Sequence, residues 1–75
     1  MNKIYNVLRI DSWSNTQEVY VGRIRDCKRS IKTIGEEYRK RGWEVKNYSF
    51  NLIIKRPDSK NDIYIYLIHC PDYEK

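Results

Sequence analysis

Apolar residues follow two different spacings along this chain, and the change between them separates strands from a helix. From Lys3 to Asp11 and from Glu18 to Arg25 the sequence is rich in β-branched and aromatic residues, which favour strands. The polar run 12–17 between them, Ser-Trp-Ser-Asn-Thr-Gln, has the composition of a turn. The first third of the chain therefore predicts a β-hairpin.

Residues 26–41 have the spacing of an amphipathic helix, because apolar residues recur there at intervals of three and four positions. The resulting stripe consists of Cys27, Ile31, Ile34 and Tyr38. Asp26 offers a side-chain acceptor at the start, and Gly42 can adopt the left-handed conformation that commonly ends a helix. We therefore predict a helix over 26–41, with Trp43 packed against its end.

The remainder of the chain has the pattern of further strands. Apolar and polar residues alternate over 43–54, and the run 63–70 is the most strand-like of the sequence. The segment 57–62, Pro-Asp-Ser-Lys-Asn-Asp, has turn chemistry and separates them. Pro71 is expected to end the last strand.

The predicted element order is ββαββ, and no linker, repeat or low-complexity tract divides residues 1–75. We therefore expect a single small α+β domain with two layers, in which one helix packs on a four-stranded, mainly antiparallel sheet. A β-grasp-like arrangement, with the first and last strands paired, is one possibility.

One helix can cover only one face of such a sheet, so the other face must lie open. Alternation in the last strand separates an aliphatic set, Ile63, Ile65 and Leu67, from a second set, Tyr64, Tyr66 and Ile68. We expect the aliphatic set to pack under the helix, which leaves Tyr64 and Tyr66 on the outer face. Tyrosine rings can stack on bases or fill a protein pocket, so this face is a candidate recognition surface. Ordinary strand propensity, or a homodimer that buries the face, would explain the tyrosines equally well.

The chain is basic, with a net charge of +5, and the excess of cations is confined to one segment. Cations outnumber anions between Arg23 and Lys46, whereas the two signs balance over the rest of the chain. A localised basic patch is the electrostatic signature of proteins that bind polyanions or acidic protein surfaces. A solvated helix face without a partner is the alternative interpretation. The positive charge argues against an acidic mimic of DNA.

The predicted helix carries cations beside its apolar stripe, in a row interrupted by one glycine. The row consists of Lys28, Lys32, Gly35 and Arg39. Glycine inside a helix costs about 1 kcal/mol relative to alanine, so its presence needs a cause. Either the helix approaches the sheet closely there, or the glycine forms a notch in which a phosphate or carboxylate reaches the backbone between cations. We expect this row to bind the partner.

Further candidate contacts lie beside this row and in the first turn. Arg29 and Lys40 fall on a neighbouring helix face, where Glu36 can neutralise Lys40 through an i, i+4 pair, so we expect this face to contribute less. Arg41 lies at the end of the helix and is also a candidate. Trp13, in the polar turn, is either folded back on the core or presented to a partner.

Residues suited to catalysis or metal binding are few. Cys27, Cys70 and His69 are too few for a zinc site, and the adjacent His69 and Cys70 would point to opposite faces of a strand. Asp58 and Asp62 flank a turn, where carboxylates usually serve solubility. We therefore expect no catalytic residue, no metal and no cofactor, and two reduced thiols.

Composition also bears on origin and location. Alanine is absent, whereas isoleucine, lysine, tyrosine and asparagine, which A/T-rich codons encode, are abundant. This bias is typical of low-GC bacteria and of their phages and plasmids. No apolar run approaches the roughly 20 residues that span a bilayer, and the first residues lack the apolar core of a signal peptide. We expect a cytoplasmic protein that has no membrane contact.

These features lead to three hypotheses of function. The first is a non-enzymatic binding protein of a phage or mobile element that sterically inhibits a host nucleic-acid-processing or defence complex, comparable in type to anti-CRISPR proteins. Its basic helix would meet an acidic patch or bound nucleic acid, while Trp13 and the outer tyrosines would anchor the contact. The second is a protein that binds DNA or RNA directly, with phosphates on the helix cations and bases on the tyrosines. The third is a structural homodimer.

Overall fold

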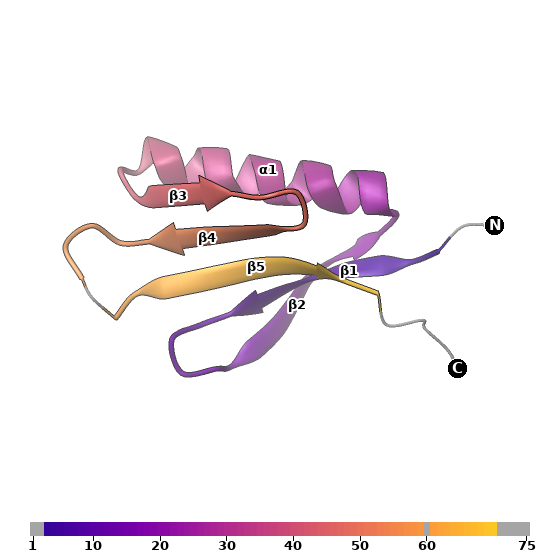
Figure 1. Ribbon diagram of the computed structural model, residues 1–75, viewed down its shortest axis with the longest axis horizontal. Coiled ribbons are helices and arrows are strands. Elements are labelled where there is room, and N and C mark those ends of the chain that lie inside the picture. Colours follow the sequence, from indigo (N-terminus) through magenta and orange to yellow (C-terminus); the bar gives the residue numbers. More distant parts are fainter. Residues whose placement is uncertain (1–2, 60, 71–75) are drawn as a thin grey trace.

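Five strands and one helix form two layers in the computed structural model, which describes residues 3–59 and 61–70 (Figure 1). The elements are β1 (Tyr5–Ile10), β2 (Thr16–Gly22), α1 (Ile24–Lys40), β3 (Glu44–Asn47), β4 (Asn51–Lys55) and β5 (Ile63–His69). The strands lie in the order β2-β1-β5-β4-β3, and all four pairings are antiparallel. The predicted α+β class is confirmed, and the first and last strands pair.

The number of strands was predicted wrongly, because residues 43–54 form a hairpin of two strands instead of one strand. The turn between β3 and β4 is closed by the Tyr48 N–H, which donates to the Asn51 carbonyl at 2.9 Å. Apolar residues continue to alternate with polar ones through this short turn, so the alternation alone conceals the reversal of the chain. The predicted end of the last strand at Pro71 lies outside the described residues.

The helix starts two residues earlier than predicted, at Ile24. Its N-cap residue is Arg23, which forms no side-chain capping hydrogen bond, so the expected capping role of Asp26 was wrong. Asp26 lies instead within the first turn, where a carboxylate interacts favourably with the positive end of the helix dipole.

The end of α1 agrees with the prediction. Gly42 has a φ of 87°, and its N–H donates to the Arg39 carbonyl, while the Trp43 N–H donates to the Tyr38 carbonyl. These two bonds form a Schellman motif, which commonly terminates helices at a glycine. The rings of Trp43 and Tyr38 meet edge to face with centroids 4.9 Å apart. Trp43 therefore packs against the helix end as expected.

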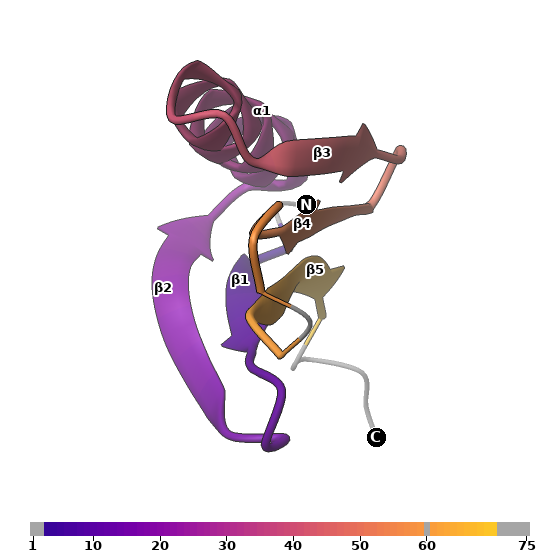
Figure 2. The same cartoon turned by 90° about the vertical axis from the view of Figure 1, so that its left-hand side faces the viewer.

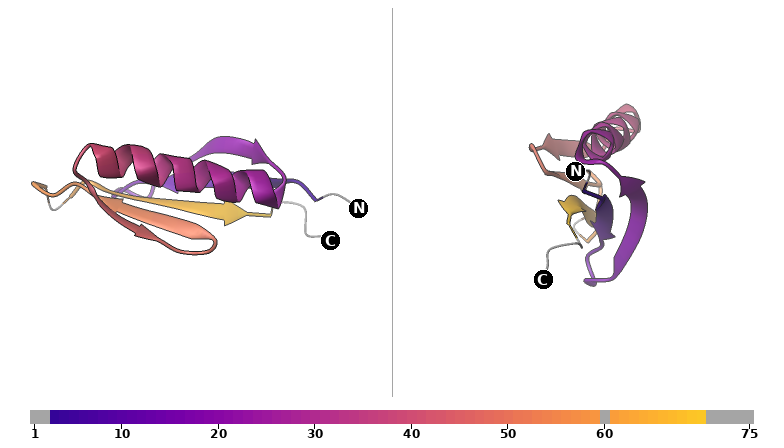
Figure 3. Two further views of the ribbon diagram at one scale, coloured as in Figure 1. Left: turned by 90° about the horizontal axis from the view of Figure 1, so that it is seen from above. Right: turned by 90° about the vertical axis from the view of Figure 1, so that its right-hand side faces the viewer.

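The core lies between α1 and one face of the sheet. Its buried apolar residues come from the helix and from three central strands: Cys27, Ile31, Val7, Leu52, Ile54 and Tyr66. The sheet curls around the helix, so that both edge strands, β2 and β3, lie beside it (Figures 2 and 3). As a result α1 contacts all five strands.

The assignment of the two sheet faces was wrong, because Tyr64 and Tyr66 lie on the helix side. Tyr66 is only 5% exposed and pairs with the buried Leu52 across β4 and β5. Tyr64 is half-buried, and its ring stacks on that of Trp43 with centroids 6.0 Å apart. Tyr66 belongs to the same buried cluster as Cys27 and Ile31 of the helix. The aliphatic residues of β5 therefore occupy the outer face.

Candidate functional site

The exposed surface of α1 carries many cations, together with the exposed carboxylates of Glu36 and Glu37. The exposed cations are Arg25, Lys28, Arg29, Lys32, Arg39, Lys40 and, at the C-cap, Arg41, which together we call the basic surface. Within residues 3–59 and 61–70, both ion pairs are formed by Arg56, so no cation of the basic surface is paired with a carboxylate. The predicted helix cations are therefore exposed and available to an anionic partner.

Gly35 serves packing and is no part of the basic surface. It is buried, and a Cβ on it would lie 3.0 Å from Cδ1 of Leu52 and 3.3 Å from Cγ1 of Val45. The helix therefore approaches β3 and β4 so closely at this point that only glycine fits without displacement. The alternative of a solvent-facing notch for a phosphate was wrong.

Two exposed aromatic residues lie at the β3–β4 turn, and one of them, Phe50, contacts the basic surface. The Lys28 ammonium lies 4.7 Å from the centroid of the Phe50 ring. Phe50 is 54% exposed and Tyr48 is 52% exposed. A hollow of about 430 Å³ is lined by Tyr48, Ser49, Phe50, Asn51 and Ile53. We call Tyr48, Phe50 and the neighbouring Lys28 the turn site; Lys28 contacts Phe50, whereas Tyr48 also lines a second hollow with Lys46, Ile53 and Ile63.

The sequence-based reasoning missed the two aromatic residues of the turn site. Both were assigned to a continuous strand, in which side chains alternate between core and solvent. The signal that could have revealed them is the polar pair Asn47 and Ser49 around Tyr48, since asparagine and serine favour turns. Aromatic residues in an exposed turn are free to meet a ligand.

The turn between β1 and β2 presents Trp13, which is 72% exposed. The turn is ordered by Asp11, whose Oδ1 accepts hydrogen bonds from the backbone N–H groups of Trp13 and Asn15, both at 2.9 Å. The Asn15 N–H makes the largest contribution to holding the pKa of the Asp11 carboxyl below its ordinary value. Ser14 adopts a left-handed φ of 66° beside the tryptophan. Of the two alternatives for Trp13, presentation to solvent is the observed one.

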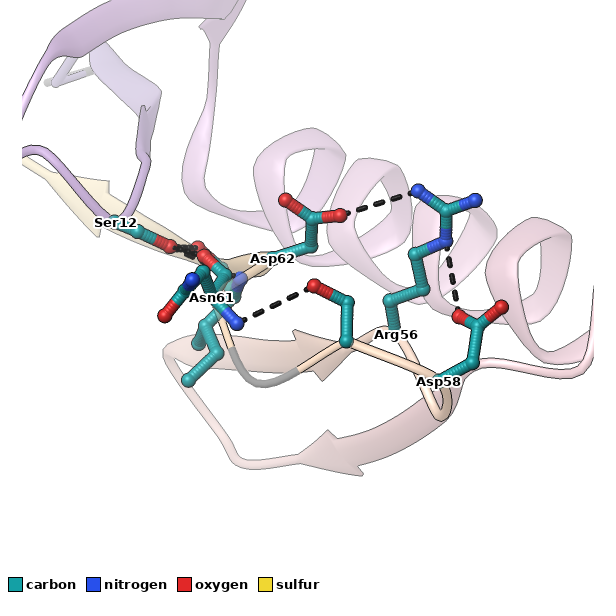
Figure 4. A network of polar contacts seen from close by, with 7 residues as sticks. Ser12, Arg56, Asp58, Asn61 and Asp62 are labelled. Carbon is teal, nitrogen blue, oxygen red and sulfur yellow. Dashed lines mark hydrogen bonds and ion pairs between the residues drawn. The ribbon is translucent and has the colours of Figure 1, made fainter.

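The loop between β4 and β5 is hydrogen-bonded to this turn (Figure 4). The Ser12 hydroxyl accepts a hydrogen bond from the Ile63 N–H at 3.2 Å and donates to the Asn61 carbonyl. In the same loop, Arg56 pairs with Asp58 and Asp62 at 3.1 Å each. The two carboxylates are therefore engaged with an arginine, and the turn that carries Trp13 is hydrogen-bonded to the start of β5.

We expect the fluorescence of Trp13 to be that of a water-exposed indole. Acrylamide should quench it readily, and Trp13→Phe should leave the bluer, less quenched emission of the half-buried Trp43. As a surface substitution, Trp13→Phe should change the free energy of unfolding by less than about 0.5 kcal/mol. Emission spectra, acrylamide titrations and urea unfolding of both proteins check this. Identical quenching of the two proteins would contradict the exposed position.

Other candidate chemical groups are engaged in structure. Cys27 is buried; this burial, followed by the nearby charge of Asp26, raises the pKa of its thiol and disfavours the reactive thiolate. His69 Nδ1 lies 3.2 Å from Asn6 Oδ1, and Asn6 Nδ2 donates to Glu18 at 2.9 Å. These contacts tie together β5, β1 and β2.

Neither a metal-ligand cluster nor a membrane-spanning helix occurs among the described residues. Residues 3–59 and 61–70 contain no cluster of three or more His, Cys, Asp or Glu side chains placed to hold a metal ion. Over the same ranges, no helix has the length and apolar character needed to cross a bilayer. Comparison with protein-family models, with curated proteins and with solved structures gives no match to this chain.

Proposed function

We propose that this protein is a non-enzymatic binding protein that holds nucleic acid on the basic surface of α1 and the adjoining turn site. The observation that carries the proposal is the exposure of seven cations along one helix and its C-cap, none of them paired with a carboxylate in the described structure. Such a surface attracts phosphates, and the release of counterions makes the binding favourable and dependent on salt.

The turn site favours single-stranded nucleic acid over a purely electrostatic partner. Exposed aromatic rings provide platforms on which unpaired bases stack, and each stacked base contributes about 1–3 kcal/mol. Because the Lys28 ammonium lies 4.7 Å from the Phe50 ring centroid, a nucleotide stacked near this ring has a cation within reach of its phosphate. Lys32 extends the same row of cations along α1.

A matched pair of charge reversals tests the proposal. Lys28→Glu with Lys32→Glu should lower the affinity for a fluorescein-labelled, single-stranded oligodeoxynucleotide by about 10- to 100-fold at low salt. The slope of log K against log salt should become shallower by about 1.4, because each phosphate contact to a single strand contributes about 0.7. Fluorescence anisotropy at several salt concentrations measures both quantities.

The control is Arg29→Glu with Lys40→Glu, which changes the net charge by the same amount on the neighbouring face. Arg29 and Lys40 belong to the basic surface, but Lys28 is the cation that contacts Phe50, so this variant should lose less affinity than the first. Circular dichroism should show that both variants remain folded. Equal losses would mean that only diffuse charge attracts the strand. An absence of salt-dependent binding by the wild-type protein would overturn the proposal of direct nucleic-acid binding.

The second candidate is the steric inhibitor of a host nucleic-acid-processing or defence complex, encoded by a phage or mobile element. The observation that favours it is Trp13, since an exposed tryptophan on a braced turn resembles the aromatic anchors that dominate protein interfaces. The wild-type protein should still capture a protein target from a host lysate after nuclease treatment. The Trp13→Ala variant should fail to capture it. A purely nucleic-acid partner should disappear on the same treatment.

A further inference from the structure

The β3–β4 turn carries one aromatic ring toward each side of the sheet. Phe50 lies toward α1, because the Lys28 ammonium is 4.7 Å from its ring centroid. Tyr48 lies toward the outer face, where it lines a hollow of about 220 Å³ with Ile53 and Ile63. Figure 2 shows this turn at the margin of the molecule. A ligand that passes around the turn therefore meets one ring after the other.

Tyr48 also borders both hollows of this region. The hollow of about 430 Å³ at the turn and the smaller hollow on the outer face share Tyr48 and Ile53 among their lining residues. The two hollows are therefore neighbours, and Tyr48, which is half exposed, lies at their common border. Its ring is within reach of a base in either hollow.

The outer hollow has cations of its own. Lys46 and Lys55 line it, together with Glu44. The register places all three on the outer face, because Lys46 pairs with Ile53 and Glu44 pairs with Lys55. Both lysines are exposed, and neither forms an ion pair in the part of the chain that the structure describes. They are thus available to an anion on the side of the sheet opposite the basic surface.

We infer that the outer hollow is a second nucleotide subsite, so that one single strand bends around the β3–β4 turn from the basic surface to the outer face. This inference rests on the proposed function, because it concerns the path of the same strand. Phosphates lie at Lys46 and Lys55, and a base stacks on Tyr48. The isoleucines 53 and 63 provide apolar surface for the base and its sugar. We call this hollow the outer subsite.

Glu44 favours a nucleotide over a simple anion at the outer subsite. Its carboxylate repels phosphate, but it accepts hydrogen bonds from the N–H groups of bases. A nucleotide satisfies both kinds of charge, with its phosphate toward the lysines and its base toward Glu44 and Tyr48. Inorganic phosphate offers only the group that Glu44 repels.

Removal of the two lysine charges tests the outer subsite. Lys46→Gln with Lys55→Gln should weaken the binding of a fluorescein-labelled, single-stranded oligodeoxynucleotide by about 5- to 50-fold at low salt. The slope of log K against log salt should become shallower by about 1.4, which corresponds to two phosphate contacts. The control Lys3→Gln with Arg23→Gln removes the same charge at exposed positions outside both sites and should leave the slope nearly unchanged.

The ring of Tyr48 is tested separately from the charges. Tyr48→Ala should lower the affinity by about 5- to 150-fold, the loss expected for one stacked base, whereas Tyr48→Phe keeps the ring and should bind like the wild type. Fluorescence anisotropy measures the affinities, and circular dichroism checks the fold. If the double lysine variant does not fold, Lys55→Gln alone should still make the slope shallower by about 0.7.

The results separate this inference from the proposed function. Suppose that the wild type binds and that Lys28→Glu with Lys32→Glu weakens it, while the outer lysine variant changes neither affinity nor slope. The outer subsite is then overturned and the proposed function stands. A Tyr48→Phe variant as weak as Tyr48→Ala would overturn the stacking on this ring. A wild type without salt-dependent binding would overturn both proposals.

Discussion

Gly35→Val is expected to lower the free energy of unfolding by about 2–3 kcal/mol. The Cβ alone would lie 3.0 Å from Cδ1 of Leu52, and valine adds two further methyl groups. Leu52 is fully buried, so it cannot move aside without disturbing the core. Helix propensity alone predicts a rise in the free energy of unfolding, since valine is a better helix former than glycine by several tenths of a kcal/mol. The sign of the change therefore separates packing from propensity.

Urea unfolding followed by circular dichroism measures this change. Thr33→Val, at an exposed position of the same helix, serves as the control and should stay within about 0.5 kcal/mol of the wild type. Unchanged stability of Gly35→Val would contradict the close approach of the helix to Leu52 and Val45.

Above about pH 10 the wild-type protein is expected to lose stability that Tyr66→Phe retains. Burial makes the largest contribution to raising the pKa of Tyr66 above its ordinary value, followed by the hydroxyl of Tyr38. The unfolded chain therefore releases this proton at a lower pH than the folded protein does. The contribution of the neutral Tyr66 hydroxyl to the free energy of unfolding is complete below the pKa of Tyr66 in the unfolded chain. It falls by about 1.4 kcal/mol per pH unit as the pH rises from there toward the pKa of Tyr66 in the folded protein.

The difference between the two proteins isolates this residue from the other groups that titrate at alkaline pH. We expect the free energies of unfolding of the wild type and Tyr66→Phe to differ by a constant amount from about pH 7 to about pH 9, and to converge or cross above about pH 10. Parallel curves over the whole range would mean that the Tyr66 hydroxyl is solvated, as it would be on the outer face.

Local signals predicted local structure well. The helix, the first hairpin and the helix end at Gly42 depend on spacing and on single residues whose backbone preferences act within a few positions. The exposure of the helix cations followed from the same spacing, because a stripe of Cys27 and Ile31 toward the core leaves the opposite side to solvent. These features needed no knowledge of distant contacts.

The side of the sheet that faces the helix could not be read from alternation. Alternation separates two sets of side chains in β5, but it does not say which set is covered. The outcome depends on the matching of volumes across the layers, where Tyr66 joins Cys27 and Ile31 in the buried cluster. The aromatic residues of the turn site were missed for a related reason, since the reversal at Tyr48 leaves the alternating pattern intact.

The strand order has a consequence for how the chain folds. β1 with β2, and β3 with β4, are hairpins that can form from neighbouring residues, whereas β5 must insert between β1 and β4 to make one sheet. Asn6 and His69, which meet across β1 and β5, are 63 positions apart in the chain. The entropy of closing this long loop opposes the pairing of β1 with β5, whereas β5 pairs with β4 across the short segment 56–62. We therefore expect the pairing of β1 with β5 to be a late step, which joins the hairpin of β1 and β2 to the antiparallel strands β3, β4 and β5.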